Sequence, residues 1–128
     1  MTSYPFLPGH GPIFIEAEAT GPALSTNLTL VLDSGATKSL IKRSSLIYIG
    51  IDPDQSPRRV QVTTGSAVEI VPVVVLTRFS ALGQHRFGFS VVAHTMPEKA
   101  AVDGVLGLDF LRGQHLAIDF RAGLITLT

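Results

Sequence analysis

The sequence contains no cysteine, and neither sign of charge is in excess. Without cysteine, a disulfide framework, a thiolate nucleophile and a cysteine-ligated zinc ion are all excluded. Ten basic and ten acidic residues give a formal net charge of zero. No dense basic run is present, so binding of nucleic acid through phosphate neutralisation is not expected.

Long hydrophobic segments are also missing. The longest apolar stretch, residues 70–76, is interrupted by Pro72 and falls well short of the ~20 residues that cross a bilayer. Residues 1–10 lack the charged and apolar regions of a signal peptide. We therefore expect a soluble, cytoplasmic protein with no membrane partner.

The composition of the chain indicates a single compact domain. The 128 residues are 45% hydrophobic and 16% charged, which is enough apolar material for a core without staples. Residues 1–12 carry three prolines and two glycines, and they predict an irregular N-terminal arm. Residues 13–128 contain no linker, repeat or low-complexity tract, and they predict a single domain.

Short β-type segments fill this domain. Residues 13–19 alternate between apolar and other side chains, which is typical of a half-buried strand. Pro72 predicts an edge strand or a bulge in its segment. Short helices are expected at residues 42–49 and from Asp109, as N-cap, to Arg112. Strands are predicted at residues 28–32, 39–41, 60–63, 67–75, 76–80, 86–93, 102–106, 116–120 and 124–127, so the fold class is all-β, as a closed or sandwich-like barrel.

Two short stretches stand out chemically. Asp33-Ser34-Gly35 follows a strand that is otherwise apolar, and apolar residues return at Leu40. These three residues alone are ordinary turn formers. Between two core segments, however, the carboxylate loses solvation, which costs stability unless the aspartate is hydrogen-bonded or functional. The second stretch, residues 102–111, reads by itself as a buried strand, a turn and a short helix.

Taken together and in this order, the two stretches resemble the retropepsin-like aspartic proteases, which include the retroviral proteases and the protease domain of DNA-damage-inducible ubiquitin-shuttle proteins. Residues 33–36 match the catalytic D-[ST]-G-A, and Val105-Leu106-Gly107 matches the later apolar pair with its glycine. Residues 64–66, between two extended arms, fit the flap, and residues 116–128 resemble the last strands of the shuttle-protein branch. Thr37 and Leu108 stand where retroviral members have an acid–arginine ion pair.

The resemblance implies a small closed β-barrel of the retropepsin type with a flap hairpin, acting as a homodimer on an extended polypeptide without metal or cofactor. Asp33 would be catalytic, with Ser34 and Gly35 supporting its loop. The substrate-binding residues implied are Ala36, Thr64, Gly65, Ser66, Val105 and Leu106.

Chemistry agrees with the dimer. Aspartic proteolysis needs two carboxylates that share one proton, and the chain has one D-S-G-A. Asp103 precedes a glycine without the intervening hydroxyl residue, so we interpret it as a strand-end carboxylate. A two-fold axis would instead bring Asp33 opposite its symmetry mate.

Other chemistries fit less well. A phosphate-binding loop would need glycine where the chain has Leu32 and Thr37, and Ser34 lies in no G-x-S-x-G elbow. The four histidines lack metal-ligand spacing. Two alternatives to an aspartic endopeptidase stay open: a non-catalytic dimerisation or peptide-binding module on the same fold, and a purely structural β-domain.

Overall fold

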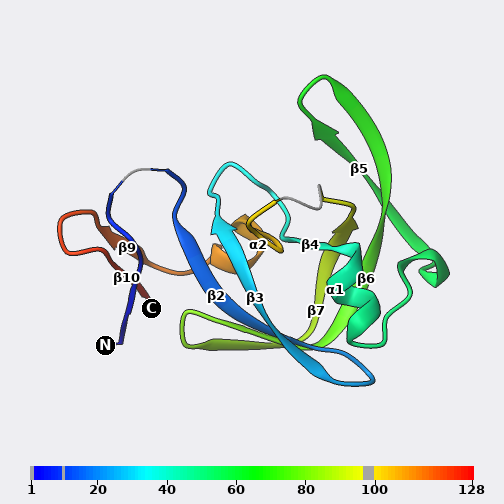
Figure 1. The fold of residues 1–128 in the computed structure, drawn as a ribbon, viewed down its shortest axis with the longest axis horizontal. Helices are drawn as coiled ribbons and strands as arrows, with labels where there is room; N and C mark the ends of the chain where they lie inside the picture. Colours follow the sequence, from blue (N-terminus) through cyan, green and yellow to red (C-terminus); the bar gives the residue numbers. More distant parts are fainter. Residues whose placement is uncertain (1, 10, 97–99) are drawn as a thin grey trace.

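The computed structural model describes residues 2–9, 11–96 and 100–128, with the backbone alone at residue 64. Six strands form a closed barrel in the order β2-β3-β8-β4-β7-β6, and pairing of β2 with β6 completes the ring (Figure 1). The all-β prediction is confirmed. The strands are β1 (Ser3–Pro5), β2 (Phe14–Thr20), β3 (Ser25–Leu32), β4 (Leu40–Lys42), β5 (Arg58–Thr64), β6 (Ala67–Ala81), β7 (Gln84–His94), β8 (Gly104–Leu106), β9 (Leu116–Asp119) and β10 (Leu124–Leu127).

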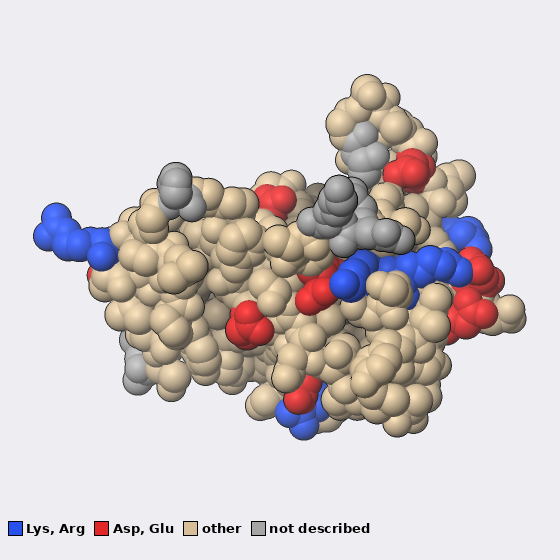
Figure 2. Space-filling model, viewed as in Figure 1, with Lys and Arg blue, Asp and Glu red and all other residues tan. Residues whose placement is uncertain are grey.

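Across the residues that the structure describes, helical structure is limited to α1 (Arg43–Tyr48), α2 (Leu108–Leu111) and a single 3-10 turn, η1 (Pro53–Gln55). None of the helices in the described ranges has the length and apolar character that a membrane crossing requires. On the face drawn in Figure 2, charged side chains are few, and blue and red groups lie next to one another.

The longest strand, β6, differs from the prediction. Residues 67–81 form one continuous strand that pairs with β5 along its first half and with β7 along its second. The expectation of two separate strands is therefore wrong, whereas the predicted edge position of Pro72 is confirmed. The β6–β7 register begins at Val73, so Pro72, which has no N–H to donate, is paired with Arg59 of β5 alone. The β5–β6 hairpin consequently extends beyond the barrel (Figure 1).

A second, three-stranded sheet of order β1-β10-β9 joins the two ends of the chain (Figure 1). The arm predicted to be irregular contains β1, whose Ser3 lies opposite Thr126 and whose Pro5 lies opposite Leu124. A segment of three residues is too short for an alternation of apolar and polar side chains to predict a strand. Their hydrogen-bonding partner is at the other end of the sequence, where local pattern cannot reveal it.

The core fills the barrel and reaches α2. Alternation in β2 is confirmed, since Ile15, Ala17 and Ala19 are buried. Phe79 of β6 stacks on Phe89 at 5.1 Å between ring centroids and meets Phe110 of α2 edge-to-face at 5.5 Å. These aromatic contacts hold α2 against the barrel, beneath the loop that follows β3.

Candidate active site

Residues 33–38 form a loop at the end of β3. The last residues of β3 pair in parallel with β8, with Leu32 opposite Leu106. Directly after this pairing, the backbone N–H of Asp33 donates to the carbonyl of Leu106 at 3.0 Å. Asp33 is therefore fixed at a strand end, as the sequence predicted.

Backbone groups orient the Asp33 carboxylate. Oδ1 accepts a hydrogen bond from the N–H of Gly35 at 2.8 Å, and the Asp33 carbonyl accepts one from Ala36 at 3.2 Å. A Cβ at residue 35 would lie 3.1 Å from Oδ1, so glycine suits this approach. Within the described residues, Oδ2 of the half-buried Asp33 and the hydroxyl of the exposed Ser34 have no hydrogen-bond partner. One carboxylate oxygen is thus held while the other remains available.

Two backbone hydrogen bonds connect the loop to α2. Leu108 N–H donates to the carbonyl of Ala36 at 2.8 Å, and Asp109 N–H donates to the carbonyl of Thr37 at 3.2 Å. The first N–H groups of a helix have no partner within the helix, and here the loop carbonyls satisfy them. Thr37 and Leu108 are the positions that lack the retroviral ion pair, so backbone hydrogen bonds make the connection there instead.

Ser39 and Asp109 add a buried polar contact that sequence reasoning missed. Ser39 is 1% exposed. Its hydroxyl donates to Asp109 Oδ1 at 2.7 Å and accepts from Gly107 N–H at 3.0 Å, while its own N–H donates to Asp109 Oδ2 at 2.9 Å. The predicted capping role of Asp109 is wrong, because this carboxylate is used by Ser39 and Gly107 at the N-cap position makes no side-chain cap. The sign of this contact in the sequence is the single acidic residue, Asp109, between the apolar Leu108 and Phe110.

The Val105-Leu106-Gly107 segment supports the loop from below. A Cβ at residue 107 would lie 2.7 Å from the carbonyl oxygen of Ala36 and 2.9 Å from the carbonyl carbon of Lys38, so only glycine fits without movement. Leu106 has no exposed surface and Val105 is half-buried within β8. The buried Leu106 supports the loop from within β8, and the substrate-binding role of Val105 and Leu106 stays a prediction.

A cavity of about 510 Å³ lies between the loop and the β5–β6 hairpin. Its walls are residues 35–38 of the loop, Leu40, residues 61–63 of β5, and Val92. Ala36, predicted to bind substrate, is one of these loop residues. Among the described side chains, Gly65 and Ser66 of the hairpin tip are not part of its walls, and the β5 arm supplies residues 61–63; the substrate-binding role of Thr64, Gly65 and Ser66 stays a prediction. Gly65 adopts a left-handed φ of 57° at the turn.

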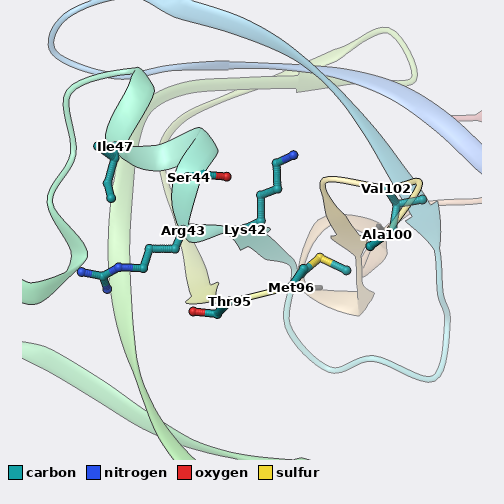
Figure 3. A pocket seen from close by; sticks show the side chains of 8 residues that line it. All are labelled: Lys42, Arg43, Ser44, Ile47, Thr95, Met96, Ala100 and Val102. Atoms are coloured by element: carbon teal, nitrogen blue, oxygen red, sulfur yellow. The ribbon is translucent and has the colours of Figure 1, made fainter. Parts of the chain in front are cut away.

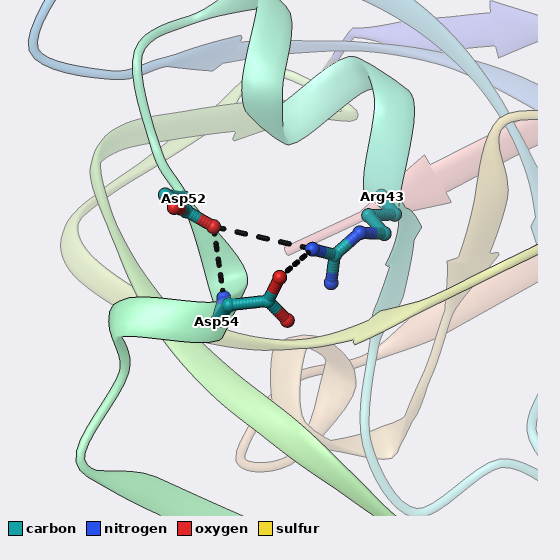
Figure 4. A network of polar contacts seen from close by, with 3 residues as sticks. All are labelled: Arg43, Asp52 and Asp54. Carbon is teal, nitrogen blue, oxygen red and sulfur yellow. Dashed lines mark hydrogen bonds and ion pairs between the residues drawn. The ribbon is translucent and has the colours of Figure 1, made fainter.

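A second cavity of about 410 Å³ lies beside α1 (Figure 3). Its cations are already paired. Lys42 Nζ lies 2.8 Å from Asp103 Oδ1, and Arg43 binds Asp54 and lies 4.0 Å from Asp52 (Figure 4). Asp103 Oδ2 also accepts the N–H of Thr29 at 2.8 Å. Asp103 therefore has the structural, strand-end role that its sequence context indicated.

Two of the histidines make side-chain contacts. His85 Nδ1 lies 2.6 Å from the hydroxyl of Ser80. His94 Nε2 donates to Glu69 Oε2 at 2.8 Å, and its Nδ1 donates to the carbonyl of Thr95 at 2.7 Å. The hydrogen bond to Glu69 is the main cause of a raised pKa for His94, which burial partly opposes. In the parts of the chain that the structure describes, no three acidic or histidine side chains gather as metal ligands would.

Comparison with known proteins identifies the class to which this fold and loop belong. The aspartyl protease family matches residues 16–110, and the chain belongs to that family. More particularly, its fold is that of the retropepsin-like aspartic proteases. A retropepsin-like aspartic protease from Rickettsia conorii superposes with a TM-score of 0.70 at 15% identity, covering 98% of this chain and 90% of the other.

The retroviral protease-like domain of Ddi1 from Leishmania major superposes with a TM-score of 0.59 at 14% identity, covering 94% of this chain and 96% of that domain. Identities this low establish a shared fold. No curated protein matches the chain in sequence.

Proposed function

We propose that the protein is an aspartic endopeptidase that acts as a homodimer on extended peptide segments. The proposal rests on the position and hydrogen bonding of Asp33, in a chain that belongs to the aspartyl protease family. Its carboxylate is held at a strand end by Gly35, has one oxygen without an intrachain partner among the described residues, and adjoins a cleft large enough for a peptide. Such a carboxylate is suited to meet a second one.

The chemistry requires that second carboxylate. Two carboxylates about 3 Å apart cannot both ionise easily, so the pair holds one proton. The ionised member accepts a proton from the attacking water, and the neutral member donates its proton to the oxygen of the scissile carbonyl. In the resulting diol intermediate, the carboxyl that took the water proton passes it to the amide nitrogen, and the now ionised carboxylate takes a proton from a diol hydroxyl as the C–N bond breaks. The products are an amine and a carboxylic acid, and the pair again holds one proton.

Among the described residues, two other acids near the loop are engaged elsewhere. Asp109 accepts two hydrogen bonds from Ser39, and Asp103 binds Lys42 and Thr29. Asp33 of a second subunit is therefore the group that completes the pair. Ser34, exposed beside Asp33, has a hydroxyl that can donate to the opposite loop across the two-fold axis.

The β5–β6 hairpin is suited to cover the substrate as a flap. It extends from the barrel above the cleft, and Gly65 at its turn tolerates the backbone change that closure needs (Figure 1). An extended peptide laid between this hairpin and residues 35–38 would place alternate side chains against Ala36, Leu40 and Val92. Thr64, Gly65 and Ser66 would reach the peptide only on closure.

The substitution Asp33→Asn tests the proposal. It keeps the size of the side chain and removes its charge, so peptide cleavage should fall by roughly 1,000-fold or more while dimerisation persists. Asp54→Asn, the same chemical change at an exposed ion pair near α1, is the matched control. Cleavage is followed by mass spectrometry on a peptide library from about pH 3.5 to 7, the range a carboxylate pair can cover.

Unchanged cleavage by the Asp33→Asn variant would refute the mechanism. Peptide binding by the wild type with no turnover at any pH would assign the chain to the binding modules instead. A wild type that neither binds nor cleaves peptides would leave a structural domain as the remaining reading.

A further inference from the structure

The cleft beside Asp33 carries one charged side chain among the residues that line it. Gly35, Ala36, Leu40, Val62 and Val92 are apolar, and Gln61 and the two threonines are neutral. The exception is Lys38, the last residue of the loop. Its position on an otherwise uncharged wall gives the cleft a local positive charge.

No described residue of the chain pairs with the charge of Lys38. Over the described ranges it takes part in no ion pair or side-chain hydrogen bond, and it is exposed. Three other cations of the molecule, by contrast, are paired: Lys42 with Asp103, Arg43 with Asp54, and Arg78 with Glu18. The Lys38 ammonium is therefore available to a bound molecule.

The β5 arm adds a second cation on the same side. Side chains two apart along a strand share a face, so Arg59 lies on the face of Gln61 and Thr63, which line the cleft together with Val62 of the opposite face. Arg59 is exposed and, among the residues described, unpaired. The nearest acid of the hairpin, Glu69, is hydrogen-bonded to His94. Apart from the proposed catalytic Asp33, the charges that the described residues offer along this cleft are positive.

We propose that the cleft selects peptides with an aspartate or glutamate side chain close to the scissile bond, and that Lys38 is the residue that recognises it. This inference rests on the proposed function, because it names the substrate class of that same site. The apolar wall of Leu40 and Val92 would contact the carbon atoms of the acidic side chain, while the ammonium binds its carboxylate. Arg59 would strengthen the preference at a neighbouring position.

Paired peptides test the proposal. An otherwise uncharged, apolar peptide carries glutamate, glutamine or lysine at each position in turn, and kcat/KM is measured for every member. At one position, the glutamate peptide should be cleaved roughly 5- to 20-fold faster than its glutamine partner, and added salt should reduce that ratio. Lys38→Gln should bring the ratio close to one, and Lys38→Glu should reverse it in favour of lysine. Arg121→Gln, an exposed cation in the β9–β10 turn, should leave the ratio as in the wild type.

Failure of this inference can be told apart from failure of the proposed function. Cleavage with equal kcat/KM for glutamate and glutamine peptides at every position would overturn the acidic preference and leave the protease standing. If the wild type cleaves nothing, the same peptides are measured by fluorescence anisotropy for binding to the Asp33→Asn protein. Equal affinity for the glutamate and glutamine forms there would overturn the inference, whereas tighter binding of the glutamate form that Lys38→Gln abolishes would support it.

Discussion

Replacing Ser39 by alanine should loosen the loop that holds Asp33. The hydroxyl makes two hydrogen bonds in a position with 1% exposure, one to the carboxylate of Asp109 and one from Gly107 N–H. A hydrogen bond to a charged group contributes about 1.5–3 kcal/mol, and a buried donor left unpaired costs about 1–3 kcal/mol. Because the N–H of Ser39 still donates to Asp109, we expect a total loss of about 2–4 kcal/mol in the free energy of unfolding.

Urea denaturation and thermal melting measure this loss, which for a domain of this size corresponds to a fall of about 10 °C in Tm. Ser44→Ala is the matched control, because Ser44 is exposed on α1. Ser39 and Asp109 act on one contact, so the double variant with Asp109→Asn should lose less stability than the two single losses combined. A change below about 0.5 kcal/mol in Ser39→Ala, the level of ordinary surface substitutions, would refute the reasoning.

Three further results are expected. Gly107→Ala should reduce stability by about 1–3 kcal/mol and reduce cleavage, because its Cβ would press on the Ala36 carbonyl. Gly9→Ala is the control, since a Cβ there meets nothing within 4 Å and should change neither property. Equal stability of the two variants would contradict this expectation. His94 has a raised pKa, mainly through Glu69, so its contribution to stability is full below the unfolded pKa of about 6.5 and is lost as pH rises through the higher folded value. His94→Gln should therefore flatten the stability profile between about pH 6 and 8, and a profile identical to that of the wild type would count against the pair. Phe79→Ala should cost about 3–5 kcal/mol, because this buried ring contacts both Phe89 and Phe110, and a loss under about 1 kcal/mol would show that the core repacks.

Local pattern was sufficient for features that depend on neighbouring residues. Alternation placed β2 and its buried face, and the polar residues after an apolar strand placed Asp33 at a strand end. The turn at Leu82 and Gly83, both with positive φ, closes the β6–β7 hairpin between the strands predicted at residues 76–80 and 86–93.

Features that depend on distant partners were not accessible in this way. The strand β1 exists because β10 pairs with it from the other end of the chain. Ser39 reads as an ordinary polar residue at the end of a turn, and its burial follows only from the docking of α2, seventy positions later, which brings Asp109 against it. The cleft walls at residues 61–63 likewise depend on how far β6 continues past the barrel.

The most direct measurement is the specific activity of the wild type as a function of protein concentration, with sedimentation on the same samples. A site made from Asp33 of two subunits predicts that activity per chain rises with concentration and follows the dimer fraction. Constant activity per chain, in samples that sediment as monomer throughout, would contradict the shared site.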